Sequence, residues 1–132
     1  MGKGLAEAFP VCRATFAEAD EALQMPLSRL CFEGPESELL LTENTQPALL
    51  TMEMAVYRLL VSRHVSPAWM AGHSLGEYTA HVAAGTVSFA DALQIVRRRG
   101  RYMQEAVPVG DGAMAAVLGL DEPTVARACS EA

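Results

Sequence analysis

The sequence of 132 residues has few of the features that mark several large classes of protein. Its three cysteines, Cys12, Cys31 and Cys129, are far apart and odd in number, which predicts neither a disulfide framework nor a zinc site. It has no run of about 18 apolar residues, and its first residues lack the layout of a signal peptide. We therefore expect a protein of the reducing cytoplasm, with no membrane partner and no bound metal.

Positive charge is also scarce. Ten Lys and Arg residues stand against sixteen Asp and Glu residues, and the formal net charge is −6. Basic residues cluster only at Arg97, Arg98, Arg99 and Arg101, so nucleic acid is not an expected partner. Hydrophobic residues make up 51% of the chain, which is enough for the core of one globular domain.

The apolar pattern predicts helices separated by turns. Pro10 can open a helix as its first residue, and Ser88 with Asp91 forms a capping-box-like pair at the start of a long helix. The short run "AWMAG" is typical of a buried strand, and "GAMAAVLGL" resembles a second one. The predicted helices cover residues 10–23, 45–60, 75–84, 88–108 and 121 onward, and the predicted strands cover 68–72 and 112–120.

One strand before residue 108 cannot form a sheet by itself, because a parallel sheet needs neighbouring strands. The last predicted helix also runs to the end of the sequence. We therefore expect an α/β protein of which this chain is an internal piece, with a strand before Met1 and further elements after Ala132.

The stretch "AGHSLGEYTAHVAAG" contains Gly-x-Ser-x-Gly at Gly72, Ser74 and Gly76, between the predicted strand and a predicted helix. A serine nucleophile needs a sharp strand-to-helix turn, and glycines let the two backbones approach each other. The N–H of Leu75, at the start of the helix, could then bind the oxyanion of a tetrahedral intermediate. The alternative is a structural turn whose serine caps the helix.

None of the three histidines is placed to take the proton of Ser74. The side chain of His73 should diverge from that of its neighbour. His81 lies seven residues along the helix, about 10 Å away, and His64 precedes the strand. If Ser74 is a nucleophile, we expect its general base elsewhere.

Arg99 is a charged residue on the apolar side of its predicted helix. When residues 91–107 are drawn at about 100° per residue, Arg99 falls in the middle of the apolar half. A buried guanidinium must be paired. Its partner is either an internal carboxylate or the carboxylate of a substrate, which an arginine can grip with two hydrogen bonds.

Four stretches together resemble the malonyl-CoA:acyl-carrier-protein transacylases of bacterial fatty-acid synthesis. They are "TQPALLT", "AGHSLGEYTA", "SFADALQIVRRRGRYMQEAVP" and "GAMAAVLGLD". The resemblance implies that Ser74 takes malonyl from coenzyme A as an ester and that the phosphopantetheine thiol of acyl carrier protein collects it. Leu75 N–H would form part of the oxyanion hole and Arg99 would hold the malonyl carboxylate, with no cofactor.

The resemblance also implies an α/β-hydrolase-like parallel-sheet core with an inserted ferredoxin-like subdomain, both incomplete in this chain. Residues 1–108 would belong to the core and residues 109–132 would begin the subdomain. The catalytic histidine and an oxyanion glutamine of the family would lie outside these residues, so the isolated chain is expected to be inactive.

Three alternatives remain at this point. One is a polyketide-type acyltransferase with the same mechanism. Another is a serine esterase, which the apolar-face arginine disfavours because simple esters carry no carboxylate. The third is a scaffold or binding fragment without catalytic activity.

Overall fold

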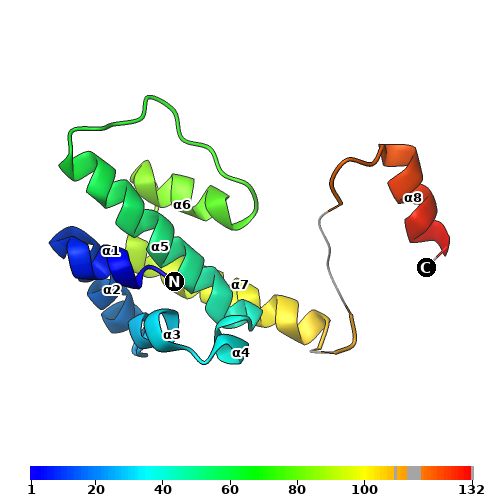
Figure 1. The fold of residues 1–132 in the computed structure, drawn as a ribbon, viewed down its shortest axis with the longest axis horizontal. Helices are drawn as coiled ribbons and strands as arrows, with labels where there is room; N and C mark the ends of the chain where they lie inside the picture. The colour runs from blue at the N-terminus through cyan, green and yellow to red at the C-terminus, as the bar shows by residue number, and fades with distance from the viewer. Residues whose placement is uncertain (109, 113–116, 132) are drawn as a thin grey trace.

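The computed structural model describes residues 1–108, 110–112 and 117–131. Within these residues the chain forms eight α-helices (Figure 1). They are α1 (Lys3–Ala8), α2 (Pro10–Leu23), α3 (Leu27–Glu33), α4 (Glu36–Leu39), α5 (Thr42–Ser62), α6 (Leu75–Ala83), α7 (Phe89–Ala106) and α8 (Glu122–Glu131).

The predicted α/β fold, with its hydrolase-like sheet core and ferredoxin-like insertion, is wrong for the described residues, which contain helices and irregular segments but no strand. Residues 68–72, predicted as a central strand, run between α5 and α6 without a ladder partner. A strand exists only when a neighbour completes its backbone hydrogen bonds, and here the nearest neighbours are helices. Residues 113–116, in the middle of the second predicted strand, lie outside the described residues.

The longer predicted helices are confirmed. α2 begins at Pro10, and the Ser88 side chain caps α7 by accepting a hydrogen bond from Asp91 N at 3.1 Å. α5 begins three residues earlier than predicted, because the Leu41 carbonyl already accepts from Thr45 N at 2.8 Å. The short helices α1, α3 and α4 were not predicted.

α5 is the central helix and packs against α2, α6 and α7 (Figure 1). Its contact with α7 is unusually close at Gly100, where a Cβ would lie 2.5 Å from the Thr42 carbonyl oxygen and 2.7 Å from Glu43 Cα. Only glycine therefore fits at this crossing. The largest fully buried apolar side chains of the core include Phe16, Leu27, Leu50, Leu93 and Val96.

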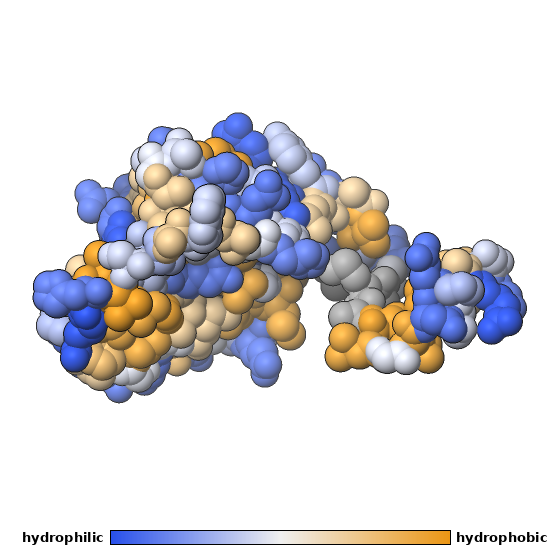
Figure 2. Space-filling view, turned by 90° about the horizontal axis from the view of Figure 1, so that it is seen from above, coloured by the Kyte–Doolittle hydropathy of each residue, from blue (hydrophilic) through white to orange (hydrophobic). Residues whose placement is uncertain are grey.

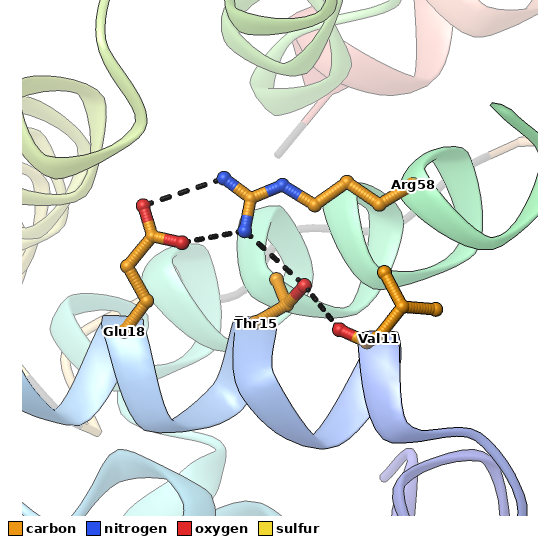
Figure 3. A network of polar contacts seen from close by, with 4 residues as sticks. All are labelled: Val11, Thr15, Glu18 and Arg58. Atoms are coloured by element: carbon orange, nitrogen blue, oxygen red, sulfur yellow. Dashed lines mark hydrogen bonds and ion pairs between the residues drawn. The ribbon is translucent and has the colours of Figure 1, made fainter. Parts of the chain in front are cut away.

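A polar network joins α2 to α5 (Figure 3). The Arg58 guanidinium donates to both carboxylate oxygens of Glu18, at 2.5 and 3.3 Å, and to Thr15 Oγ1 at 3.2 Å. Thr15 in turn donates to the Val11 carbonyl at 2.9 Å. The guanidinium also lies 4.9 Å from the centre of the Phe89 ring, so the network reaches α7.

The segment between α5 and α6 loops away from the helices (Figure 1). Nearly all of its residues are exposed. Its Trp69 side chain is 92% exposed. Figure 2 shows further apolar patches on the surface of the molecule, and such patches are typical of contact surfaces. Among the described residues, no helix is both long enough and apolar enough to cross a membrane.

Candidate active site

Ser74 occupies a sharp turn immediately before α6. Its φ of 56° and ψ of −105° are strained for a residue other than glycine. The turn brings Gly72 against the first turn of α6, so that a Cβ on Gly72 would lie 2.0 Å from the carbonyl carbon and oxygen of Gly76. A Cβ on Gly76 itself would meet nothing within 4 Å. Of the two glycines in the motif, Gly72 is therefore the one that the turn requires.

The Ser74 hydroxyl does not cap the helix that follows it. Its side chain is exposed and makes no cap hydrogen bond. The Leu75 N–H, at the first position of α6, has no acceptor among the described residues. The geometry thus gives no support to a capping serine, and it leaves a backbone donor beside the hydroxyl.

Arg99 points at this turn from α7. Its Nη2 donates to Ser74 Oγ at 3.1 Å, and its Nη1 donates to Gln46 Oε1 at 2.6 Å. The guanidinium is half-buried and lies 5.8 Å from the centre of the Tyr78 ring. Across the described part of the chain, no carboxylate forms an ion pair with Arg99. The internal carboxylate that could have been its partner is therefore not found there.

Gln46, on α5, is a site residue that the sequence analysis missed. It is only 5% exposed, and its Nε2 faces the sulfur of Met103 at 3.4 Å while its Oε1 accepts from Arg99. The signal that could have revealed it is spacing. Gln46 lies four and eight residues before Leu50 and Met54, so it shares their buried face of α5. A polar side chain at such a position needs a polar partner.

Each of the two residues in this contact lines a different hollow. One, of about 680 Å³, is lined by residues 69–76 together with Glu53 and Thr79. Thr79 Oγ1 donates to the Glu53 carboxylate there. The other, of about 980 Å³, runs along α7 and includes Arg99, Ile95 and Tyr102. Ser74 opens into the first hollow and Arg99 into the second.

No histidine donates to or accepts from Ser74 in the described structure. His81 Nδ1 lies 2.9 Å from Thr86 Oγ1 at the end of α6, and His64 follows α5 in a left-handed conformation with φ of 63°. His73 is exposed. The groups around the hydroxyl are thus an arginine and a free backbone N–H, which can hold negative charge but cannot accept a proton.

The two buried cysteines, Cys12 and Cys31, are not competing nucleophiles. Burial raises the pKa of the Cys31 thiol to about 11, and it also raises the pKa of Cys12. Both are therefore neutral core residues near neutral pH. Within the described ranges, no group of three or more His, Cys, Asp or Glu residues could hold a metal ion.

The chain is similar to known acyltransferases over nearly all of its length. Residues 1–131 match the model of the family described as "Acyl transferase domain". The malonyl CoA-acyl carrier protein transacylase of Escherichia coli (strain K12) is 53% identical over 129 residues, and that of Bacillus subtilis (strain 168) is 55% identical over 121 residues. These matches cover 97% and 92% of this chain but 42% and 38% of the relatives.

Solved structures agree with the sequence relatives. A malonyl-transacylase in complex with a type II PKS acyl-carrier protein superimposes with a TM-score of 0.90 at 49% identity, over 99% of this chain and 43% of that one. The malonyl-CoA:acyl carrier protein transacylase of Xanthomonas oryzae pv. oryzae gives a TM-score of 0.88 at 52% identity, over 96% and 41%. The chain thus spans about two fifths of the length of the relatives it matches. It belongs to the acyl transferase domain family.

Proposed function

We propose that this chain forms the acyl-binding part of a malonyl transacylase, which moves malonyl from coenzyme A to the phosphopantetheine thiol of acyl carrier protein. The observation that carries this proposal is the contact of 3.1 Å between Arg99 Nη2 and Ser74 Oγ. It places a cation that binds carboxylates beside a strained serine on a glycine turn. The curated relatives named above are malonyl transacylases, which supports the same reaction.

The reaction would proceed in two displacements. Ser74 Oγ attacks the thioester carbonyl of malonyl-CoA and loses its proton, and the carbon–sulfur bond breaks to release the thiol of coenzyme A. The phosphopantetheine thiol gives up its proton and its sulfur attacks the carbonyl of the malonyl-serine ester. The bond from that carbon to Ser74 Oγ breaks, and Ser74 regains a proton. In both steps the carbonyl oxygen carries negative charge in the tetrahedral intermediate, and Leu75 N–H would donate to it.

Arg99 would select the acyl group. The malonyl carboxylate is separated from the reacting carbonyl by one methylene, and a guanidinium 3.1 Å from Ser74 Oγ is close enough to hold it during attack. Acetyl and simple ester substrates carry no carboxylate that Arg99 could bind. The arginine therefore favours a transacylase over a serine esterase.

The proton acceptor would come from outside the contacts described here. Ser74 Oγ accepts a hydrogen bond from Arg99, and none of the three histidines bonds to it. We propose that the 132-residue chain alone transfers malonyl slowly or not at all.

A polyketide carrier protein is a second candidate acceptor. One solved relative, 49% identical to this chain, is a malonyl-transacylase bound to a type II PKS acyl-carrier protein. The same active site could load either carrier, because both present the same thiol arm. We also propose a cytoplasmic location, which the free thiols of Cys12, Cys31 and Cys129 support.

Intact mass spectrometry tests the transfer reaction. We would replace the matching segment of the Escherichia coli enzyme by these residues and incubate the chimera, and the 132-residue chain, with malonyl-CoA. We expect a malonyl adduct on the chimera, its absence in Ser74→Ala, and its discharge by carrier protein. If the chimera folds but carries no adduct, the proposed reaction is wrong and the glycine turn is structural.

A further inference from the structure

The two halves of the Arg99 guanidinium are held differently. Nη1 donates at 2.6 Å to Gln46 Oε1, and this glutamine is only 5% exposed. Nη2 donates at 3.1 Å to Ser74 Oγ, in the exposed part of the site. Gln46 is further fixed by its contact with Met103. The contact with Gln46 is therefore the shorter and more buried of the two, and the contact with Ser74 is the one open to exchange with a ligand.

A carboxylate competes with the Ser74 hydroxyl for this nitrogen. A carboxylate carries a full negative charge and can accept two parallel hydrogen bonds from a guanidinium, whereas the serine oxygen is neutral and accepts one. A carboxylate-bearing acyl group that enters the site should therefore take Nη2 from Ser74, while Nη1 stays on Gln46. No other side chain in the described structure donates to Ser74 Oγ, so this exchange would leave the hydroxyl free of protein donors.

The exchange matters because the donated bond opposes attack. A serine hydroxyl attacks through an oxygen lone pair, and it has two of them. A cationic donor on one lone pair stabilises the resting hydroxyl and directs the oxygen toward α7. The oxygen is therefore a weaker nucleophile, and it attacks a carbonyl more slowly, as long as this bond persists.

We infer that Arg99 restrains Ser74 in the substrate-free site, and that a carboxylate-bearing acyl group releases the serine when it binds. This inference rests on the proposed function and adds regulation to it. Arg99 would discriminate against a neutral acyl group twice, because that group neither binds the guanidinium nor frees the nucleophile. Gln46 is a positioning residue in this scheme.

Two serine-reactive phosphonate probes of equal size test the restraint. One carries a carboxylate, and the other carries the methyl ester of the same group and is neutral. Their labelling rates at Ser74 would be measured by intact mass on the 132-residue chain and on the chimera, for the native sequence and for Arg99→Met. Arg98→Met is the matched control, because Arg98 is adjacent on α7 and exposed, while the described hydrogen bond to Ser74 comes from Arg99.

If Arg99 restrains the serine, Arg99→Met should label faster with the neutral probe, by about fivefold, as expected for the loss of one exposed hydrogen bond to a charged donor. The same substitution should slow the carboxylate probe, and Arg98→Met should change neither rate. An unchanged or slower neutral-probe rate in Arg99→Met overturns the restraint.

A measurement without any substitution guards against a variant that fails to fold. Acetate can occupy Arg99 without carrying an acyl group into the turn, so it should accelerate neutral-probe labelling of the native sequence compared with chloride at the same ionic strength. No acceleration by acetate overturns the proposal. A malonyl adduct on Ser74 together with no acceleration would leave the transfer reaction standing and remove only the restraint.

Discussion

The two sides of the candidate site are built very differently. Arg99 and Gln46 stand on α7 and α5, two long helices that cross tightly at Gly100 and share the core. Ser74 ends an exposed segment, residues 63–74, that has no strand partner among the described residues. We call the first side the helical framework and the second the serine segment.

This difference shows which half of the site the chain can position by itself. The helical framework holds the arginine through helix packing and a buried side-chain bond, both internal to the described residues. The serine segment depends on its glycine turn and on the first turn of α6. The chain covers about two fifths of its relatives' length, so in the chimera the segment would also be exposed to residues of the Escherichia coli enzyme that the 132-residue chain does not contain.

The largest effect is expected in the serine segment, from Gly72→Ala in the chimera. The added Cβ would lie 2.0 Å from the Gly76 backbone, which must then move and take Ser74 with it. Because a displacement of about 1 Å at a nucleophile costs roughly 100-fold in rate, kcat/KM for malonyl-CoA should fall by at least that factor.

Gly76→Ala is the matched control, because its Cβ would meet nothing within 4 Å in this chain. It should lose far less activity than Gly72→Ala. Equal losses in the two variants would mean that the close approach at Gly72 does not shape the turn.

The helical framework should respond in stability rather than in activity alone. Gly100→Ala would place a Cβ 2.5 Å from the Thr42 carbonyl and force α5 and α7 apart. We expect the free energy of unfolding of the 132-residue chain to fall by about 2 kcal/mol, measured by urea denaturation followed by circular dichroism.

Gly4→Ala, also in a helix, should instead be neutral or slightly stabilising, because its Cβ would be in open space and alanine favours helix. If Gly100→Ala were as well tolerated as Gly4→Ala, the tight crossing would not exist in solution.

A smaller effect is expected where the two regions meet. Gln46→Leu removes the acceptor of Arg99 Nη1 and leaves the exposed bond to Ser74 as the one side-chain hydrogen bond of the guanidinium within the described residues. The ratio of malonyl to acetyl transfer by the chimera should fall about tenfold, which corresponds to one buried hydrogen bond to a charged group. Gln104→Leu, whose amide donates to the Val107 carbonyl, should leave the ratio unchanged. Retained selectivity in Gln46→Leu would show that Arg99 needs no anchor on α5.

The sequence predicted those parts of the fold whose signals are local. α2 begins at Pro10, and α7 is capped by the Ser88–Asp91 pair. Both signals lie within the helix that they start, so both helices appear where expected. The strand at 68–72 failed for the opposite reason. Its apolar composition is local, but the hydrogen bonds that make a strand must come from another segment.

The same distinction applies to the site. The position of Arg99 on the apolar half of its helix was visible from periodicity, and the structure finds it half-buried and bonded to Ser74. Its partner Gln46 is 53 residues away in the sequence, and periodicity along one helix cannot show which side chain of another helix it meets. The close approach of Gly72 to Gly76 leaves no room for a Cβ on Gly72. It was recognisable from the sequence because the whole turn lies within five residues.

The smallest effect is spectroscopic and separates the two regions directly. Trp69 is the one tryptophan of the chain, and it lies in the serine segment with 92% of its surface exposed. Its fluorescence in the 132-residue chain should resemble that of a free tryptophan and should change little during urea unfolding, while the circular dichroism of the helical framework changes cooperatively. In the chimera, Trp69 should shift to shorter wavelength if the rest of the enzyme covers the segment. A blue-shifted emission that moves together with the helices in the 132-residue chain would mean that the serine segment is packed as firmly as the framework, and the contrast between the two would be lost.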